Sequence, residues 1–131
     1  MPATRDMRQP IPDDVRRFIL TSVPSIPFLE AMLLMRAEPR TQWDAASIAR
    51  RLYIPASRAE ELIAQLADAA LAERTGTGVR WQPDPALAAV VDTLATLYAE
   101  DLVGVTELIH SRQERRAHQF ADAFRLRKKE E

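Results

Sequence analysis

The stretch DAASIARRLYIPASRAEELIAQL, residues 44–66, decides the fold. Asp44 is a typical N-cap, and the apolar residues that follow it at helical spacing predict a short helix that ends before Pro55. Ser57 and Glu60 match the S-x-x-E capping box, so a second helix is expected to begin at Ser57. The core side of this second helix is expected to hold Ala59, Leu62, Ile63, Leu66 and Ala70. Residues 44–66 therefore predict two short helices joined by a tight connection.

A β-hairpin is expected directly after the helix pair. Residues 75–78, with the sequence TGTG, form a typical turn between two β-like runs, Leu71 to Arg74 and Val79 to Gln82. Two short helices followed by a hairpin are the elements of a winged helix, in the order that this fold requires.

From Ala45 to Leu66 the pair resembles the bacterial winged helix-turn-helix transcriptional regulators. The positions that set the angle between the helices hold Ile48, Leu52, Ile54, Ala59 and Leu62, and the position that needs a small residue holds Ala49. The hairpin falls where that family carries its wing.

The chain departs from the family at Tyr53, where Gly is common because Gly accepts a positive φ without penalty. We expect either a differently shaped turn or backbone strain at Tyr53. The whole chain is also similar to small uncharacterised bacterial proteins that end in a segment like FADAFR, which implies no function.

Helices are expected on both sides of this unit. Asp13 and Asp14 can cap a helix that buries Val15, Phe18 and Ile19. Ser25 and Pro27 suit the start of a helix that is apolar over most of its circumference, and such a helix is normally buried as the centre of a core. The expected fold is mainly α, a winged helix-turn-helix with a short two-stranded wing, an N-terminal helix and a long C-terminal helix. Its expected parts are a flexible arm (residues 1–11), a winged-helix domain (12–83) and a long helix with a basic tail (84–131).

The long helix is expected to begin at Asp84 and Pro85 and to run for about 28 residues, or about 40 Å. Its apolar stripe is spaced close to a heptad repeat and consists of Leu87, Val91, Leu94, Tyr98, Leu102, Val105 and Ile109. A helix that extends beyond its domain needs a surface on which to bury such a stripe. A symmetry mate in a homodimer is the favoured candidate, and the N-terminal helix of the same chain is the other.

Composition narrows the function classes. The chain is 47% hydrophobic and 28% charged, has a formal net charge of −1 and lacks cysteine, which excludes disulfides and thiolate chemistry. No apolar run approaches the length of a membrane span or a secretory signal, so a cytoplasmic protein without a membrane partner is expected. Between His110 and Lys129 seven basic residues stand against two acids, which indicates a basic tail.

The family resemblance implies that the helix beginning at Ser57 enters the major groove of duplex DNA. The candidate base readers are Ser57, Arg58, Glu61 and Gln65, and the candidate phosphate contacts are Arg50, Arg51, Arg74 and Arg80. The same helix carries Glu61 and Asp68 on its outer side, although DNA affinity comes mainly from Lys and Arg. Two functions therefore stay open: a DNA-binding transcriptional regulator, and a protein-interaction module without nucleic acid, for which Trp81 is a candidate anchor.

An enzyme is not expected. His110 and His118 alternate with Glu107 and Glu114 along one side of a helix, a pattern that pairing within the helix explains. A closed metal site usually needs three or four converging ligands, so no metal is predicted. The TGTG turn lacks the Lys and the following helix of a phosphate-binding loop, and no cofactor is expected.

Overall fold

The computed structural model describes the backbone of residues 11–130 and the side chains of residues 11–121. Within this part the chain forms six helices and one two-stranded antiparallel sheet. In chain order the elements are α2 (Asp13–Ser22), α3 (Ile26–Ala37), α4 (Ala45–Leu52), α5 (Ala56–Asp68), β1 (Ala72–Thr75), β2 (Gly78–Trp81), α6 (Pro85–Glu100) and α7 (Leu102–Glu130). The prediction of a mainly helical fold with a small hairpin is confirmed.

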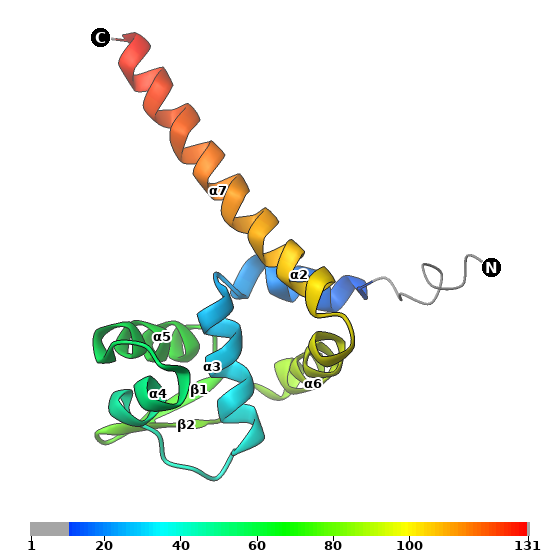
Figure 1. Cartoon of the computed structure of the whole chain (residues 1–131), viewed down its shortest axis with the longest axis vertical. Helices are drawn as coiled ribbons and strands as arrows, with labels where there is room; N and C mark the ends of the chain where they lie inside the picture. Colours follow the sequence, from blue (N-terminus) through cyan, green and yellow to red (C-terminus); the bar gives the residue numbers. More distant parts are fainter. Residues whose placement is uncertain (1–10, 131) are drawn as a thin grey trace, which may run out of the picture.

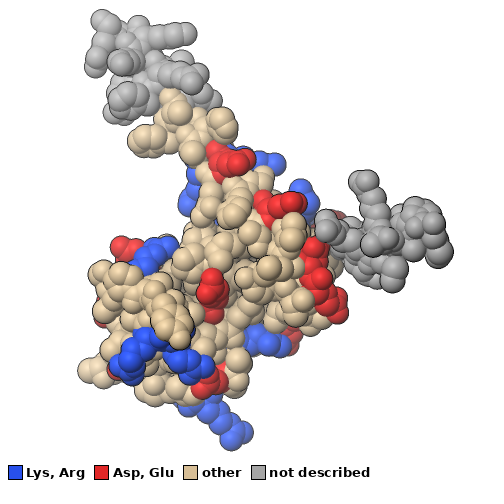
Figure 2. Space-filling model, in the orientation of Figure 1, with Lys and Arg blue, Asp and Glu red and all other residues tan. Residues whose placement is uncertain are grey.

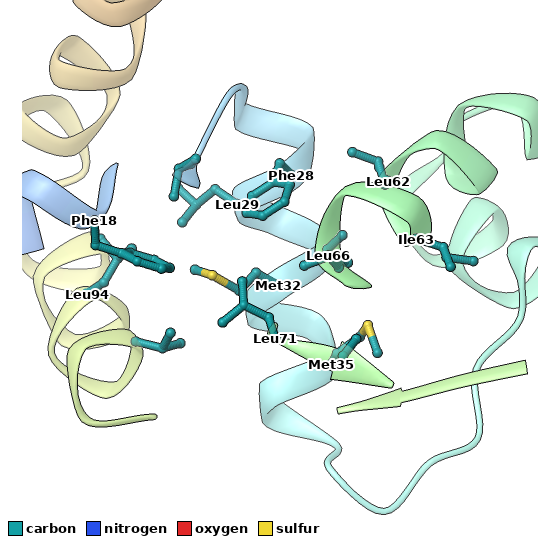
Figure 3. Packing of buried hydrophobic residues seen from close by; sticks show 14 of the residues in the cluster. Phe18, Phe28, Leu29, Met32, Met35, Leu62, Ile63, Leu66, Leu71 and Leu94 are labelled. Carbon is teal, nitrogen blue, oxygen red and sulfur yellow. The ribbon is translucent and has the colours of Figure 1, made fainter. Parts of the chain in front are cut away.

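Helix α3 is the centre of the core, as its apolar sequence predicts. Ser25 caps it by accepting a hydrogen bond from the Phe28 amide at 3.3 Å, and Pro27 stands in its first turn. Its buried residues are Phe28, Leu29, Ala31, Met32 and Met35. Figure 3 shows Phe18 and Leu94 on one side of this helix and Leu62 and Leu66 on the other. Helix α3 therefore joins the α4–α5 pair to the α2–α6–α7 group.

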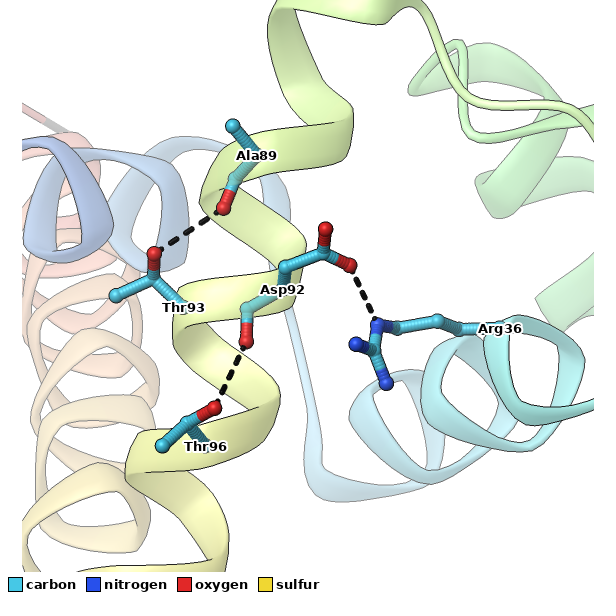
Figure 4. Close-up of polar contacts among 5 residues, drawn as sticks. All are labelled: Arg36, Ala89, Asp92, Thr93 and Thr96. Atoms are coloured by element: carbon cyan, nitrogen blue, oxygen red, sulfur yellow. Dashed lines mark hydrogen bonds and ion pairs between the residues drawn. The ribbon is translucent and has the colours of Figure 1, made fainter.

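An ion pair connects helix α6 to α3. The Arg36 Nε atom lies 2.8 Å from Asp92 Oδ1, as Figure 4 shows. On the same helix, the hydroxyls of Thr93 and Thr96 donate to the carbonyls of Ala89 and Asp92. These local bonds satisfy the threonine hydroxyls on the exposed side of α6.

The capping of the α4–α5 pair is partly as predicted. Asp44 caps α4, accepting from the Ser47 amide at 2.7 Å, while the Ser47 hydroxyl accepts from the Asp44 amide at 2.9 Å. The bond from the Ser47 amide is the largest cause that lowers the pKa of Asp44. The predicted capping box at Ser57 is wrong, because α5 begins at Ala56 and follows Pro55, which offers no side-chain acceptor. The reciprocal box lies one helix earlier than expected.

The core side of α5 is as predicted with one exception. Ala59, Leu62, Ile63 and Leu66 are buried. Ala70 is exposed, beyond the helix end, with a φ of 62°. The helix has already ended there, so Ala70 cannot continue its apolar side.

The hairpin pairs β1 and β2 from Ala72↔Trp81 to Thr75↔Gly78, within one residue of the predicted strands. Trp43 adds a bridge to its outer edge: the Trp43 amide donates to the Val79 carbonyl and the Val79 amide to the Trp43 carbonyl, each at 2.8 Å. A Cβ at Gly78 would lie 2.7 Å from the Trp43 carbonyl oxygen. Gly78 is therefore required for the close approach of the segment before α4.

The prediction of one long C-terminal helix is wrong, because the helix breaks at Asp101. Its φ and ψ of −139° and 65° are not helical, and its carboxylate accepts from the Gly104 amide at 3.0 Å. A Cβ at Gly104 would collide with that carboxylate, so the glycine gives the cap its space. Asp101 therefore ends α6 and caps α7, and the chain changes direction between them (Figure 1).

The break lets the predicted apolar stripe fold back on the chain itself. Helices α6 and α7 both pack against α2 and against each other. Of the stripe, Val91, Leu94, Val105 and Ile109 are buried, Leu87 and Tyr98 are partly buried, and Leu102 is 53% exposed. The stripe is thus covered by the N-terminal helix, the second of the two surfaces considered. The stripe is therefore not available as a dimer interface. Homodimerisation stays a prediction, and it would need another surface.

Helix α7 runs to Glu130, and its C-terminal half stands away from the rest of the molecule in Figure 1. Phe120 is 75% exposed. Residues 1–10 of the predicted arm lie outside the described residues, as do the side chains of Arg125, Arg127, Lys128 and Lys129.

In residues 11–130 no single helix has both the length and the hydropathy to cross a membrane; α2 and α3 pass that test only as a pair bent by 115°.

Candidate functional site

Helices α4 and α5 and the turn of the hairpin lie together on one side of the molecule, opposite α6 (Figure 1). The two helices meet through Tyr53, Ile54 and Pro55, and the Ile54 amide donates to the Ala49 carbonyl at 3.1 Å. Ile48 is buried, and Ala49, Leu52 and Ile54 are packed against the core. The exposed residues of α4, α5 and the hairpin therefore form the candidate surface.

The predicted base readers do not all lie on it. Ser57 and Glu61 are exposed, as expected. Arg58 is partly covered: its Nη1 atom lies 2.7 Å from Glu61 Oε2, and its Nη2 atom is 3.4 Å from Ser25 Oγ. Gln65 is only partly exposed and lines a hollow between α5 and α7. Ser57, Arg58 and Glu61 therefore lie together at the start of α5, whereas Gln65 lies one turn farther along and lines the hollow.

The exposed flank of α5 is acidic. It carries Glu60, Glu61 and Asp68, and the positive charge of Arg58 is neutralised by Glu61. Carboxylates on this flank repel phosphates, so the middle and the end of α5 are poorly suited to a polyanion. The same flank suits a partner with a basic surface.

The four candidate phosphate contacts are all exposed. Arg51 pairs with Glu38 at 2.7 Å and lies over the Trp43 ring, 5.5 Å from its centroid. Arg80 is 3.9 Å from Glu73. Among the described side chains, no carboxylate lies within ion-pair distance of Arg50 or Arg74. Exposed ion pairs contribute about 0–1 kcal/mol, so Arg51 and Arg80 can exchange their partners for phosphates at small cost.

The start of α5 is open to solvent. Basic side chains gather over α4 at the lower left of Figure 2. At the first turn of α5, Ala56 and Ser57 are exposed, and no side chain caps their amides. Free amides and the positive end of the helix dipole favour an anion at this position. The positive part of the surface is therefore the α4–α5 turn and the hairpin.

Tyr53 adopts a left-handed backbone conformation, which Gly accepts without penalty. Its φ and ψ are 57° and 47°, in the left-handed region, and its side chain is 95% exposed. Residues with a Cβ disfavour this region, so the positive φ at Tyr53 corresponds to the second alternative, backbone strain.

We expect Tyr53→Gly to raise the free energy of unfolding by about 0.5–1 kcal/mol, because the strain is removed and an exposed ring loses no packing. Urea unfolding followed by circular dichroism measures the change. Tyr53→Ala is the matched control, since it removes the ring but keeps the strain, and should give no gain. A Gly variant no more stable than the Ala variant would show that the turn is unstrained.

Two arginines on α7 were not singled out from the sequence, although Arg112 and Arg116 line the same hollow as Gln65. They continue the buried stripe of Val105 and Ile109 at spacings of three and four residues. The signal was therefore present: the side of α7 that faces the body changes from apolar to basic after Ile109.

In the described part of the chain, no three His, Asp or Glu side chains are grouped closely enough to hold a metal ion. No protein-family model, curated protein or solved structure matches the chain.

Proposed function

We propose that the chain is a winged-helix, DNA-binding transcriptional regulator that contacts duplex DNA through the α4–α5 turn and the hairpin. The observation that carries the proposal is the position of four exposed arginines on a helix pair followed by a hairpin: Arg50, Arg51, Arg74 and Arg80. In this reading the hairpin is the wing and α5 is the recognition helix. Homodimerisation remains part of the proposal, through a surface other than the buried stripe.

Phosphate contacts supply the affinity in this mode of binding. The free amides at the start of α5 and the neighbouring arginines would hold one backbone, and the hairpin arginines the other side of the groove. Only the N-terminal part of α5 would reach base edges, with Ser57, Arg58 and Glu61 as readers, because Gln65 faces the hollow. Four phosphate contacts correspond to a slope of about −3.6 in a plot of log affinity against log salt.

We expect the double variant Arg74→Ala, Arg80→Ala to flatten this slope by about 2 units and to weaken binding to all sequences alike. Fluorescence anisotropy of a labelled random duplex pool across a range of salt concentrations measures the slope. Arg16→Ala, Arg17→Ala is the control, since these exposed residues lie on α2, which packs against α6 and α7. Failure of the parent protein to retain any duplex at low salt would refute DNA binding.

The second candidate is a protein-interaction winged helix, favoured by the acidic flank of α5. Such a flank would attract a partner with Lys and Arg on its surface. The two functions predict opposite effects of the double variant Glu61→Gln, Asp68→Asn. It should tighten duplex binding by removing repulsion, whereas it should weaken a complex with a basic partner.

A further inference from the structure

A hollow of about 360 Å³ lies between α5 and α7, beside the end of α2. Arg112 and Arg116 line it from α7, and Gln65 and Asp68 line it from α5. The two groups differ in what they offer: the α7 side has only hydrogen-bond donors with positive charge, and the α5 side has a carboxylate and an amide.

The α7 side is positive and uncompensated. Arg112 and Arg116 are one helical turn apart, and no carboxylate among the described side chains is within ion-pair distance of either. Arg112 donates from Nη1 to the Ile19 carbonyl at 3.4 Å, which holds its side chain against the last turn of α2. Burial and the charge of Arg116 lower the pKa of Arg112. An anion bound here would be stabilised by both guanidinium groups.

The α5 side adds a carboxylate and a carboxamide. The Oε1 atom of Gln65 is buried, and it has no hydrogen-bond partner in the described part of the chain. An atom with almost no accessible surface does not touch a ligand in the hollow, so Asp68 is the acceptor of this side. Asp68 is exposed at the same hollow and forms no ion pair with a described basic residue. A cation with N–H donors fits the Asp68 carboxylate.

We propose that this hollow binds a small zwitterion, an amino acid that has one carboxylate and one ammonium group. The carboxylate binds Arg112 and Arg116, and the ammonium group donates to Asp68. Phe28 and Pro24 line the hollow as well and provide apolar contact for the methylene groups. A simple anion would be repelled by Asp68, and a simple cation by the two arginines. The site goes beyond the proposed DNA binding and does not depend on it, because it uses none of the arginines of the turn or hairpin.

Isothermal titration calorimetry of the full chain tests the proposal with a series in which the two charges move apart: glycine, β-alanine, 4-aminobutanoate and 5-aminopentanoate. We expect one chain length to bind best, because the separation of the two walls is set by the fold. Its N-acetyl derivative and its amide, which each lack one charge, should bind at least about tenfold more weakly. Absence of binding by every member at about 10 mM, or equal binding of acetate, would overturn the proposal.

Variants separate the site from the fold. Arg116→Ala and Asp68→Asn should each weaken the best zwitterion at least about tenfold, with the thermal midpoint of the free protein unchanged, because both side chains are exposed. Arg115→Ala is the matched control: it removes a neighbouring exposed arginine that does not line the hollow, and should bind like the parent. Equal binding by all three variants would also overturn the proposal. Arg116→Ala leaves the arginines of the α4–α5 turn and the hairpin in place and should keep the salt slope for random duplex, so failure of this site and failure of DNA binding are distinguishable.

Discussion

The Ile109→Ala variant is expected to lose about 2–5 kcal/mol of unfolding free energy, and the loss should be the same at every protein concentration. Ile109 is 0% exposed, on the part of α7 that packs against α2. Its removal leaves a cavity in a core that one chain forms alone. Guanidinium unfolding at about 1 and about 100 µM protein, followed by circular dichroism, measures both the loss and its concentration dependence.

Leu102→Ala is the matched control because Leu102 belongs to the same sequence stripe but is 53% exposed. We expect its unfolding free energy to stay within about 0.5 kcal/mol of the parent value. A stripe that served as the seam between two copies would behave differently. Both variants would then be destabilised, because each truncation would remove contacts between the two copies.

Local signals in the sequence predicted most helix boundaries. Asp44 and Ser25 cap the helices that follow them, and Pro85 stands in the first turn of α6, as expected. Each of these features depends on residues within a few positions, so the chain carries the information locally. The TGTG turn likewise predicted the bounds of both strands to within one residue, because few conformations join two strands so closely.

The break at Asp101 was not visible in the periodicity. The apolar positions on either side of it, Leu94, Tyr98 and Val105, keep helical spacing through a residue that is not helical. The sequence signal for the break is the pair Asp101 and Gly104. Asp101 is a capping residue, and Gly104, three positions later, has no Cβ. Whether such a pair interrupts a helix depends on what the two halves can pack against, and here that surface is α2, far away in sequence.

In the candidate site, too, some features could be predicted from the local sequence and others depend on distant parts of the chain. Exposure of Arg50, Arg51, Arg74 and Arg80 followed from their positions relative to the apolar residues of α4 and the hairpin. The placement of Gln65 against α7 could not be predicted from its own helix, because helical spacing put it on the outer side of α5. That side of α5 faces solvent only at the N-terminal end of the helix. Farther along, α7 approaches it and brings Arg112 and Arg116 to the same hollow.

Trp43→Ala is expected to lower the free energy of unfolding by about 3–5 kcal/mol. Trp43 is 2% exposed and belongs to the core, and its main chain bridges the edge of β2 at Val79. Truncation removes the ring under Arg51, while the two backbone hydrogen bonds to Val79 can persist. The hairpin should therefore keep its register but lose its packing. Urea unfolding, with Trp81 as the remaining fluorescent tryptophan, measures the effect.

Trp43→Phe distinguishes the packing of the ring from its polar edge. The Trp43 Nε1 atom is buried and has no hydrogen-bond partner among the described residues. A buried donor without a partner costs about 1–3 kcal/mol, and phenylalanine removes that donor while it keeps an aromatic ring beside Arg51. We therefore expect the Phe variant to lose less than half of what the Ala variant loses. Equal losses in both variants would mean that the indole N–H group is satisfied in the folded protein, and that tryptophan is required here for more than its volume.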